Sequence, residues 1–370
     1  MSSTITQTTQ APTEGVAKLS LSGAPAVPNN VWFSSTGLPE SEYPYKHYLP
    51  SLEKKVKGPP LTEFVHVDPG HEALKHAEPR AFLAAGKVEN LSPRLGSVVE
   101  GVQLHKLDTA ARQDLALFVA QRGVVAFRDQ DFIDQDASWL VNDWTAFWGR
   151  PHVHHSTVQP VGHPELHLVY RAAGSDYNYD LSDRSNSTNW HSDVSYERQP
   201  PGLTALFLFD SPDSGGDTGY VDQRNTYQRL TPSFREYLET LSVLHSGVQQ
   251  VQSTLDGKYG SGQVGRDPVE NVHPLVRRHP VTGEKALYIN RTFSRHIVGL
   301  KREESEALLN FLYDHIERGQ ESQVRVSWKP RTVVLWDNRI TAHTANLDFD
   351  NTPARRHGAR LTPQAERPTL

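Results

Sequence analysis

The chain has 370 residues, of which 36% are hydrophobic, with a formal net charge of −5 at pH 7 and no cysteine. The negative charge gives no electrostatic argument for nucleic acid or an anionic membrane as a partner. The absence of cysteine excludes disulfides, thiolate zinc sites and cysteine nucleophiles. No apolar run approaches the ~18 residues of a membrane span. The residues from Met1 to Gln7 have neither the basic nor the apolar region of a presequence. We therefore expect a cytoplasmic protein.

Composition divides the chain into four parts. Residues 1–30 are rich in Ser, Thr, Pro, Ala and Gln and predict a disordered tail. Residues 31–90 carry scattered prolines and tyrosines, and predict an N-terminal extension that wraps over the core or over a neighbouring subunit. Regular patterns run from 91 to 362, which we expect to be the main domain. Residues 363–370 are expected to form a short C-terminal tail.

Seven segments of the main domain have a clear hydrophobic pattern. In chain order, they predict a helix at 107–118, strands at 123–130 and 203–209, a helix at 234–241, a strand at 286–290, a helix at 303–318 and a strand at 332–336. These strands do not alternate regularly with helices. The pattern favours a mainly β fold with helices, a sandwich or barrel, over a doubly wound parallel sheet.

One segment, Asn189-Trp190-His191-Ser192-Asp193-Val194, contains a histidine and a carboxylate two residues apart. In an extended strand these side chains project from the same face, so His191 and Asp193 could bind one metal ion from one side. Two imidazoles and one carboxylate form the facial iron(II) site of non-haem oxygenases, which leaves the opposite positions open. A second histidine would have to come from elsewhere in the chain.

The spacing alone is weak evidence. With 18 His and 43 Asp plus Glu among 370 residues, about two His-x-acid triplets are expected by chance, and the chain contains five. The other four lie in a turn, a charged segment, a Pro/Gly loop and a predicted helix, and begin at His66, His76, His163 and His315. A polar pair at the surface remains the competing interpretation of His191 and Asp193.

Two further segments carry candidate site residues. His343 follows the strand predicted at 332–336, and a barrel would bring it back to His191; a loop histidine is the alternative. If 354–361 is a strand, Arg356 and Arg360 share a face, and Gly358 leaves room between the two guanidiniums. Inward arginines are costly unless anions neutralise them. One could therefore bind a dicarboxylate cosubstrate through a forked pair, with help from the hydroxyl of Thr218, and the other an anionic substrate.

At these positions the sequence resembles the taurine/2-oxoglutarate dioxygenase (TauD/TfdA) family. The likeness runs from about Leu91 to Thr362. The N-terminal part resembles the extension of fungal sulfonate dioxygenases. The matching motifs are Arg128-Asp129-Gln130, Asn189-Trp190-His191-Ser192-Asp193-Val194, Gly215-Gly216-Asp217-Thr218, His279-Pro280-Val281-Thr282-Gly283 and Trp336-Asp337-Asn338-Arg339.

The resemblance implies a double-stranded β-helix (jelly-roll) core with iron(II) held by His191, Asp193 and His343. It implies 2-oxoglutarate as cosubstrate, with its far carboxylate on Arg356 and Thr218. O2 is the other co-reactant. Dioxygenases of this kind hydroxylate the carbon next to the sulfur of an organosulfonate, and release sulfite and an aldehyde together with succinate and CO2.

The resemblance also assigns the small anionic substrate to three residues. His154 and Arg360 match positions that hold the sulfonate, and Phe293 matches one that packs on the carbon chain. Family habit further suggests a homo-oligomer.

The sequence departs from the taurine enzymes at Thr157, Ser187, Gln250 and Val251. These differences predict that a sulfonate other than taurine, or several sulfonates, will be accepted. Two alternatives stay open. One is a dioxygenase of the same fold that acts on a sulfate ester, an aryloxy acid or a natural-product intermediate. The other is a metal-binding jelly roll without oxidative activity, for which an arginine at 356 would have no use.

Overall fold

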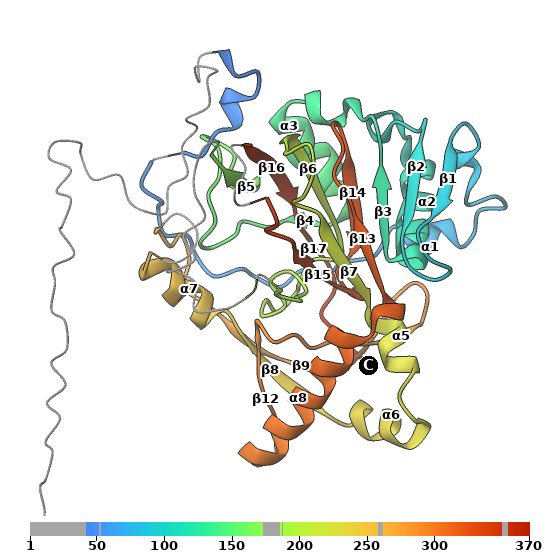
Figure 1. Cartoon of the computed structure of the whole chain (residues 1–370), viewed down its shortest axis with the longest axis vertical. Coiled ribbons are helices and arrows are strands. Elements are labelled where there is room, and N and C mark those ends of the chain that lie inside the picture. Colours follow the sequence, from blue (N-terminus) through green and yellow to red (C-terminus); the bar gives the residue numbers. More distant parts are fainter. Residues whose placement is uncertain (1–41, 52, 173–185, 187, 258–261, 350–353) are drawn as a thin grey trace, which may run out of the picture.

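The computed structural model describes residues 42–51, 53–172, 186, 188–257, 262–349 and 354–370. The tail predicted at 1–30 and Ser187 lie outside these residues. Figure 1 shows a large sheet with helices in the upper part of the molecule, and a smaller sheet beside the long helix α8 (Arg302–Arg318) in the lower part.

A seven-stranded sheet forms the upper part, with its strands side by side in Figure 1. Two of its inner strands, at 203–210 and 333–337, are largely apolar because both faces are covered; Val333, Val334 and Leu335 have no exposed surface. The strands, from one edge to the other, are β1 (Lys87–Asn90), β2 (Ser97–Glu100), β3 (Val124–Phe127), β14 (Val333–Asp337), β6 (Leu203–Asp210), β16 (Arg356–Leu361) and β5 (His167–Arg171).

A three-stranded sheet packs against one face of the seven-stranded sheet. Its strands are β13 (Gln323–Val326), β7 (Thr218–Asp222) and β15 (Thr341–Ala345). The two sheets share an apolar cluster in which the rings of Tyr220 and Trp336 have centroids 5.8 Å apart. The expectation of a mainly β fold with helices is confirmed.

Helices cover the other face of the seven-stranded sheet. The longest is α2 (Thr109–Arg122), which begins where the Asp108 carboxylate accepts the Ala111 N–H at 2.8 Å. It ends at Gly123, whose φ of 71° suits glycine. The shorter helices here are α3 (Ala137–Trp139), a π-helix (Leu140–Thr145) and α4 (Ala146–Trp148). Together they bury the largest core cluster.

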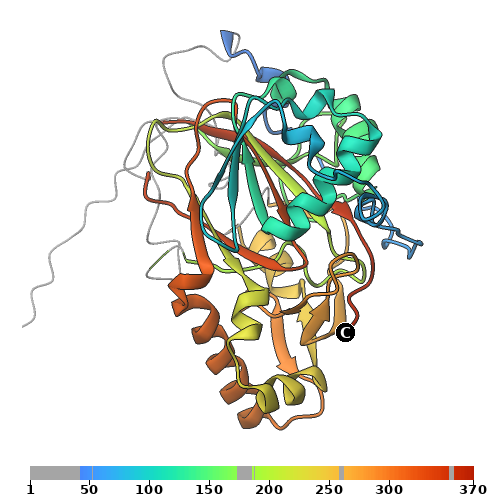
Figure 2. The ribbon, with the colours of Figure 1, turned by 90° about the vertical axis from the view of Figure 1, so that its right-hand side faces the viewer.

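Figure 2 shows the lower part from the side. In the sequence, this part is inserted between β7 and β13. An apolar stripe on α8, which includes Leu309 and Leu312, packs in a second core cluster. The elements are α5 (Gln223–Gln228), α6 (Pro232–Glu239), β8 (Ser242–Ser246), α7 (Val248–Leu255), β9 (Glu270–Pro274), β10 (Val276–Arg278), β11 (Lys285–Leu287) and β12 (Ser294–Ile297).

Three local expectations differ from the structure. The strand predicted at 286–290 ends at Leu287, as part of β11. The segment 191–193 is not a strand: His191 forms a single bridge with His343, and a turn begins at Asp193, with Val194 at a φ of 40°. Gly358 does not make room for guanidiniums. A Cβ there would lie 2.3 Å from Phe207 O and 2.4 Å from a Leu208 methyl, so glycine is required by the approach of β6.

The chain before β1 lies on the core along most of its described length. The Tyr43 hydroxyl bonds to His357 Nδ1 at 2.7 Å, and the Tyr48 ring stacks on Phe209. Further on, Asp68 is buried, where it accepts a hydrogen bond from Arg339 at 2.5 Å. The helix α1 (Gly70–Ala73) follows and packs against α2.

The other end of the chain is also packed. β17 (Pro363–Gln364) pairs with β4 (Arg150–Pro151), and the Glu366 carboxylate bonds to Arg277 at 2.7 Å. None of the described helices is both long enough and apolar enough to cross a bilayer.

Candidate metal centre

His191, Asp193 and His343 converge in space although the histidines are far apart in the sequence. Each offers one ligand atom, and these atoms lie within 4.8 Å of one another. The Nε2 atoms of both histidines are 3.5 Å from Asp193 Oδ1. Among the described residues, this is the one group of three or more histidines and carboxylates with such a geometry. The expected convergence is confirmed.

Backbone pairing sets the positions of the two histidines. His343 lies in β15, and His191 is its antiparallel partner: His191 N–H donates to His343 O at 3.0 Å, and His343 N–H donates to His191 O at 2.8 Å. The two imidazole centroids are consequently 4.3 Å apart. The intervening side chain, Ser192, turns away and donates to Thr341 O at 2.9 Å.

Asp193 is held by Asn338, which follows β14. The Asn338 side chain accepts the Asp193 N–H at 2.7 Å and donates to the Asp193 carbonyl at 3.0 Å. The carboxylate is 1% exposed, and its Oδ2 has no hydrogen-bond partner among the described residues. A buried carboxylate oxygen without a partner is costly unless a cation occupies the site.

The protonation states suit metal binding. Burial lowers the pKa of His343 to about 3, so its imidazole is neutral. His191 Nδ1 lies 2.7 Å from Asn189 O, which places its proton there and leaves Nε2 as a ligand. Burial alone would raise the pKa of Asp193, but the Arg360 guanidinium and the two histidines hold it far below the usual range. Two imidazoles and one carboxylate fit iron(II).

Arg356 and Thr218 lie together at a second position. Arg356 begins β16 and is 6% exposed; burial lowers its pKa to about 10, and no described carboxylate pairs with it. Thr218 begins β7 on the facing sheet, where its hydroxyl accepts a hydrogen bond from Trp328 Nε1 at 3.2 Å. The Trp328 ring also lies 6.0 Å from the Arg356 guanidinium carbon. A buried guanidinium beside a hydroxyl is a site for a carboxylate.

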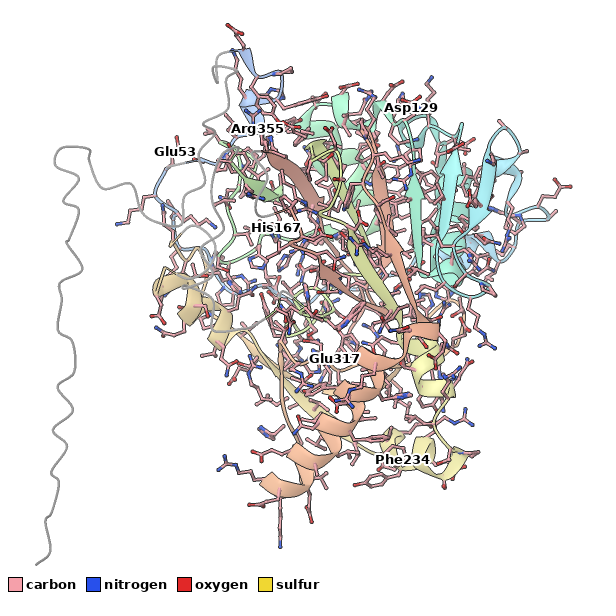
Figure 3. All side chains as sticks on the ribbon, viewed as in Figure 1. Glu53, Asp129, His167, Phe234, Glu317 and Arg355 are labelled. Atoms are coloured by element: carbon pink, nitrogen blue, oxygen red, sulfur yellow. The ribbon has the colours of Figure 1, made fainter. Side chains whose placement is uncertain are left out.

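Arg360 lies next to the metal ligands. Its Nη1 donates to Asp193 Oδ1 at 2.6 Å, and its Nη2 donates to His167 Nδ1 at 2.6 Å. His167 projects from β5 and is labelled in Figure 3. Its ring is 5.0 Å from that of His154. His154 Nδ1 accepts N–H groups from Ser156 and Thr157, so Nε2 carries the proton and can donate to an anion.

Phe293 provides an apolar wall on the other side. Its centroid is 6.1 Å from that of His191 and 4.9 Å from that of Tyr196. Asn290 fixes the turn by accepting the Phe293 N–H at 2.8 Å. Val251, one of the positions that depart from the taurine enzymes, is buried, and Gln250 accepts a hydrogen bond from the Tyr196 hydroxyl at 3.0 Å.

Three residues of the site were not predicted from the sequence. Asn338 stands in the Trp336-Asp337-Asn338-Arg339 motif, so the motif contained a signal for it. His167 and Trp328 have no local pattern that separates them from other buried aromatic residues. Only the pairing of β16 with β5 brings His167 to Arg360.

Comparisons with known proteins agree with this geometry. The family described as "Taurine catabolism dioxygenase TauD, TfdA family" matches residues 87–362. An alpha-ketoglutarate-dependent sulfonate dioxygenase of Saccharomyces cerevisiae is 40% identical over 89% of this chain and 79% of that protein. The alpha-ketoglutarate-dependent dioxygenase cnsP of Penicillium expansum is 39% identical over 88% and 87%. The crystal structure of a taurine dioxygenase from Burkholderia xenovorans, 30% identical, superposes with a TM-score of 0.62 over 77% of this chain and 93% of that one.

Proposed function

This chain belongs to the taurine catabolism dioxygenase TauD, TfdA family, and we propose from that membership that it is an iron(II)- and 2-oxoglutarate-dependent dioxygenase that removes sulfite from an organosulfonate. The two facing sheets form its jelly-roll core, within a catalytic domain of residues 91–362. Residues 31–90 are an N-terminal extension, and its described part, from residue 42 onward, contacts this domain.

His191, Asp193 and His343 would hold iron(II), and Arg356 with Thr218 would hold the far carboxylate of 2-oxoglutarate. When bound, iron and this cosubstrate supply the oxidising chemistry, in which O2 and 2-oxoglutarate give succinate, CO2 and one hydroxylated carbon. The protein contributes fixed ligands and a preformed cationic anchor. Trp328 donates to Thr218 Oγ1, so the hydroxyl proton of Thr218 is free to donate to the carboxylate.

Arg360 and the Nε2–H of His154 would bind the sulfonate, with Phe293 against the carbon chain. Because Arg360 contacts both Asp193 and His167, an anion on this guanidinium is held directly beside the metal ligands. The carbon next to sulfur would then lie close to the metal ligands. Once that carbon is hydroxylated, the hydroxyl loses its proton and the C–S bond breaks. Sulfite leaves with the bonding electrons, and an aldehyde remains.

The observation that carries the proposal is the pair of arginines on one strand, Arg356 buried and Arg360 partly buried. Arg356 and Arg360 project from the same face of β16. Arg356 lies away from the metal ligands and has no described carboxylate as partner, whereas Arg360 contacts Asp193. Two separate anions are therefore expected, one beside the iron and one at the far end of the cosubstrate. A metal-binding protein without oxidative activity would have no use for Arg356.

The test is a panel of sulfonates, including taurine, with iron(II), ascorbate, 2-oxoglutarate and O2. We expect sulfite and succinate in equal amounts from at least one sulfonate other than taurine, and neither product from Asp193→Ala. Succinate formed only with sulfate esters or carboxylic acids, and no sulfite from any sulfonate, would replace this substrate class with another one.

A further inference from the structure

A polar hollow, lined by two lysines and one glutamate, lies where the N-terminal extension meets the loop that carries His154. Its volume is about 110 Å³, and its lining includes Ser51, Lys54, Lys55, Gln159 and Gln263. The extension is outside the segment matched by the family, residues 87–362, yet the yeast relative matches 89% of this chain. One wall of the hollow, which includes Lys55, therefore lies outside the segment that the family matches, and the other wall lies within it.

Backbone contacts fix the extension to this loop. Ser51 N–H donates to Gln159 O at 2.8 Å, and Gly58 N–H donates to Gly265 O at 2.6 Å. Gly265 N–H in turn donates to His155 O at 2.6 Å. The segment between Ser51 and Gly58 is thus tied at both ends to the wall of the substrate site. Glu53, labelled in Figure 3, is exposed and also lines the hollow.

Lys55 is the inward residue of the segment. Its backbone N–H donates to Gln263 Oε1 at 2.6 Å, and its ammonium donates to the carbonyl of Thr157. Burial lowers the pKa of Lys55 to about 8, and no described carboxylate forms an ion pair with it. A half-buried ammonium that has only a carbonyl as partner favours the arrival of an anion.

A continuous chain of contacts joins Lys55 to the metal centre. Thr157, whose carbonyl binds the ammonium, donates its N–H to His154 Nδ1 at 3.3 Å. His154 packs on His167, which bonds to Arg360. Two cations, Lys55 and Arg360, therefore flank this pair of histidines, and the charge of Lys55 contributes to the low pKa of His167, after burial and Arg360.

We propose that Lys55 forms a second anion subsite, so that the enzyme prefers sulfonates with a second anionic group, such as a carboxylate, at the end away from the sulfonate. This inference rests on the proposed function, in which Arg360 and His154 hold the sulfonate. A substrate with one anionic group leaves Lys55 without a counter-charge, and a substrate with an ammonium at the far end meets like charge.

The test compares three sulfonates of equal length: 3-sulfopropionate, propanesulfonate and taurine. With the full-length iron-loaded enzyme, we expect kcat/KM for 3-sulfopropionate to exceed that of the other two by about tenfold or more. Lys55→Met should remove this preference by raising KM for 3-sulfopropionate about tenfold, with kcat/KM for propanesulfonate unchanged. Lys55→Arg should retain the preference.

Lys54→Met is the matched control, because Lys54 lines the same hollow but is exposed; it should behave like the unaltered enzyme. A preference that survives in Lys55→Met, an equal loss for all three sulfonates, or no preference in the unaltered enzyme would overturn the subsite.

Failure of the proposed function gives a different result, namely no sulfite from any of the three. In that case, calorimetric titration of the protein with 3-sulfopropionate and propanesulfonate decides the question. Tighter binding of 3-sulfopropionate that Lys55→Met abolishes supports the subsite, and equal binding by both proteins overturns it. Melting temperatures of the Lys55 and Lys54 variants identify any loss of folding.

Discussion

Asn338 holds the backbone of Asp193 on both sides, accepting its N–H at 2.7 Å and donating to its carbonyl at 3.0 Å. The carboxylate ligand therefore depends on a residue 145 positions later in the chain. This contact is buried, and nothing else among the described residues bonds to the Asp193 N–H.

Asn338→Ala is expected to weaken metal binding about 10- to 100-fold, as loss of a group that orients a ligand commonly does. The carboxylate would still be present but would no longer be fixed. Calorimetric titration of the metal-free protein with Mn(II) measures the change in metal affinity. Asn142→Ala, at an exposed position, is the control. Unchanged Mn(II) affinity in a folded Asn338→Ala protein would contradict the role of Asn338.

Replacing Arg356 should weaken the binding of the cosubstrate more than the binding of the sulfonate. Arg356→Gln removes the buried cation without a carboxylate partner, so we expect KM for 2-oxoglutarate to rise at least about tenfold, with a smaller change in KM for the sulfonate. Arg360→Gln should show the reverse pattern. Steady-state kinetics with each substrate varied in turn distinguish the two. If both variants raise the same KM, the division of labour between the two arginines is wrong.

Asp68 connects the extension to the core through Arg339. Asp68→Asn removes a buried charge that faces the guanidinium at 2.5 Å. Because this change removes one of the three carboxylates that face the Arg339 guanidinium and leaves Asp337 and Glu366 in place, we expect the free energy of unfolding to fall by about 2 kcal/mol. Urea denaturation measures this loss. Glu53→Gln, at an exposed position of the same extension, should change it little. A loss of equal size in both proteins would show that Asp68 has no special role.

His357 should make the protein less stable in mild acid. Its Nδ1 bonds to the Tyr43 hydroxyl, its Nε2 lies 3.0 Å from Tyr48 O, and burial lowers its pKa to about 3. In the unfolded state, where the pKa of a histidine is about 6.5, His357 takes up a proton that it does not bind in the folded state. Stability contributed by this group is therefore complete above pH 6.5 and falls below it by about 1.4 kcal/mol per pH unit.

Urea denaturation at pH 7.5, 6.5 and 5.5 measures this dependence. Other buried histidines add to it, so the comparison is between the slopes of the unaltered protein and His357→Gln, which should differ by about one proton. His296→Gln, at an exposed position, should keep the original slope. Equal slopes in all three proteins would mean that His357 does not titrate on unfolding.

Local patterns predicted the elements better than the site. The helices at α2 and α8 and the strands β3, β6 and β14 follow from their apolar periodicity, because burial on one or both faces imposes it directly. The same reasoning was wrong for 191–193. A turn and a single bridge to β15 bring His191 and Asp193 together, and neither of these features has a hydrophobic pattern.

The convergence of His191, Asp193 and His343 was predictable because their residue types and the family likeness agree. His167 and Lys55 were not, since their relation to Arg360 and Thr157 depends on strand pairing and on how the extension packs. The burial of Asp68 was not predicted either. The sequence indicated a turn at Pro69-Gly70, and the structure has a turn at Pro69 that leads into α1. It gave no sign that the Asp68 carboxylate is buried against a residue 271 positions away.

The charge balance around Arg339 has a practical consequence for the boundaries of the enzyme. Its guanidinium faces Asp337, Asp68 and Glu366, and two of these three carboxylates lie outside the segment 87–362 that the family shares. A protein trimmed to that segment would keep every iron ligand, yet it would leave a buried cation with a single counter-ion, directly beside the asparagine that orients Asp193. We therefore expect the smallest active piece of this chain to be larger than the segment that the family matches, beginning before Asp68 and ending after Glu366.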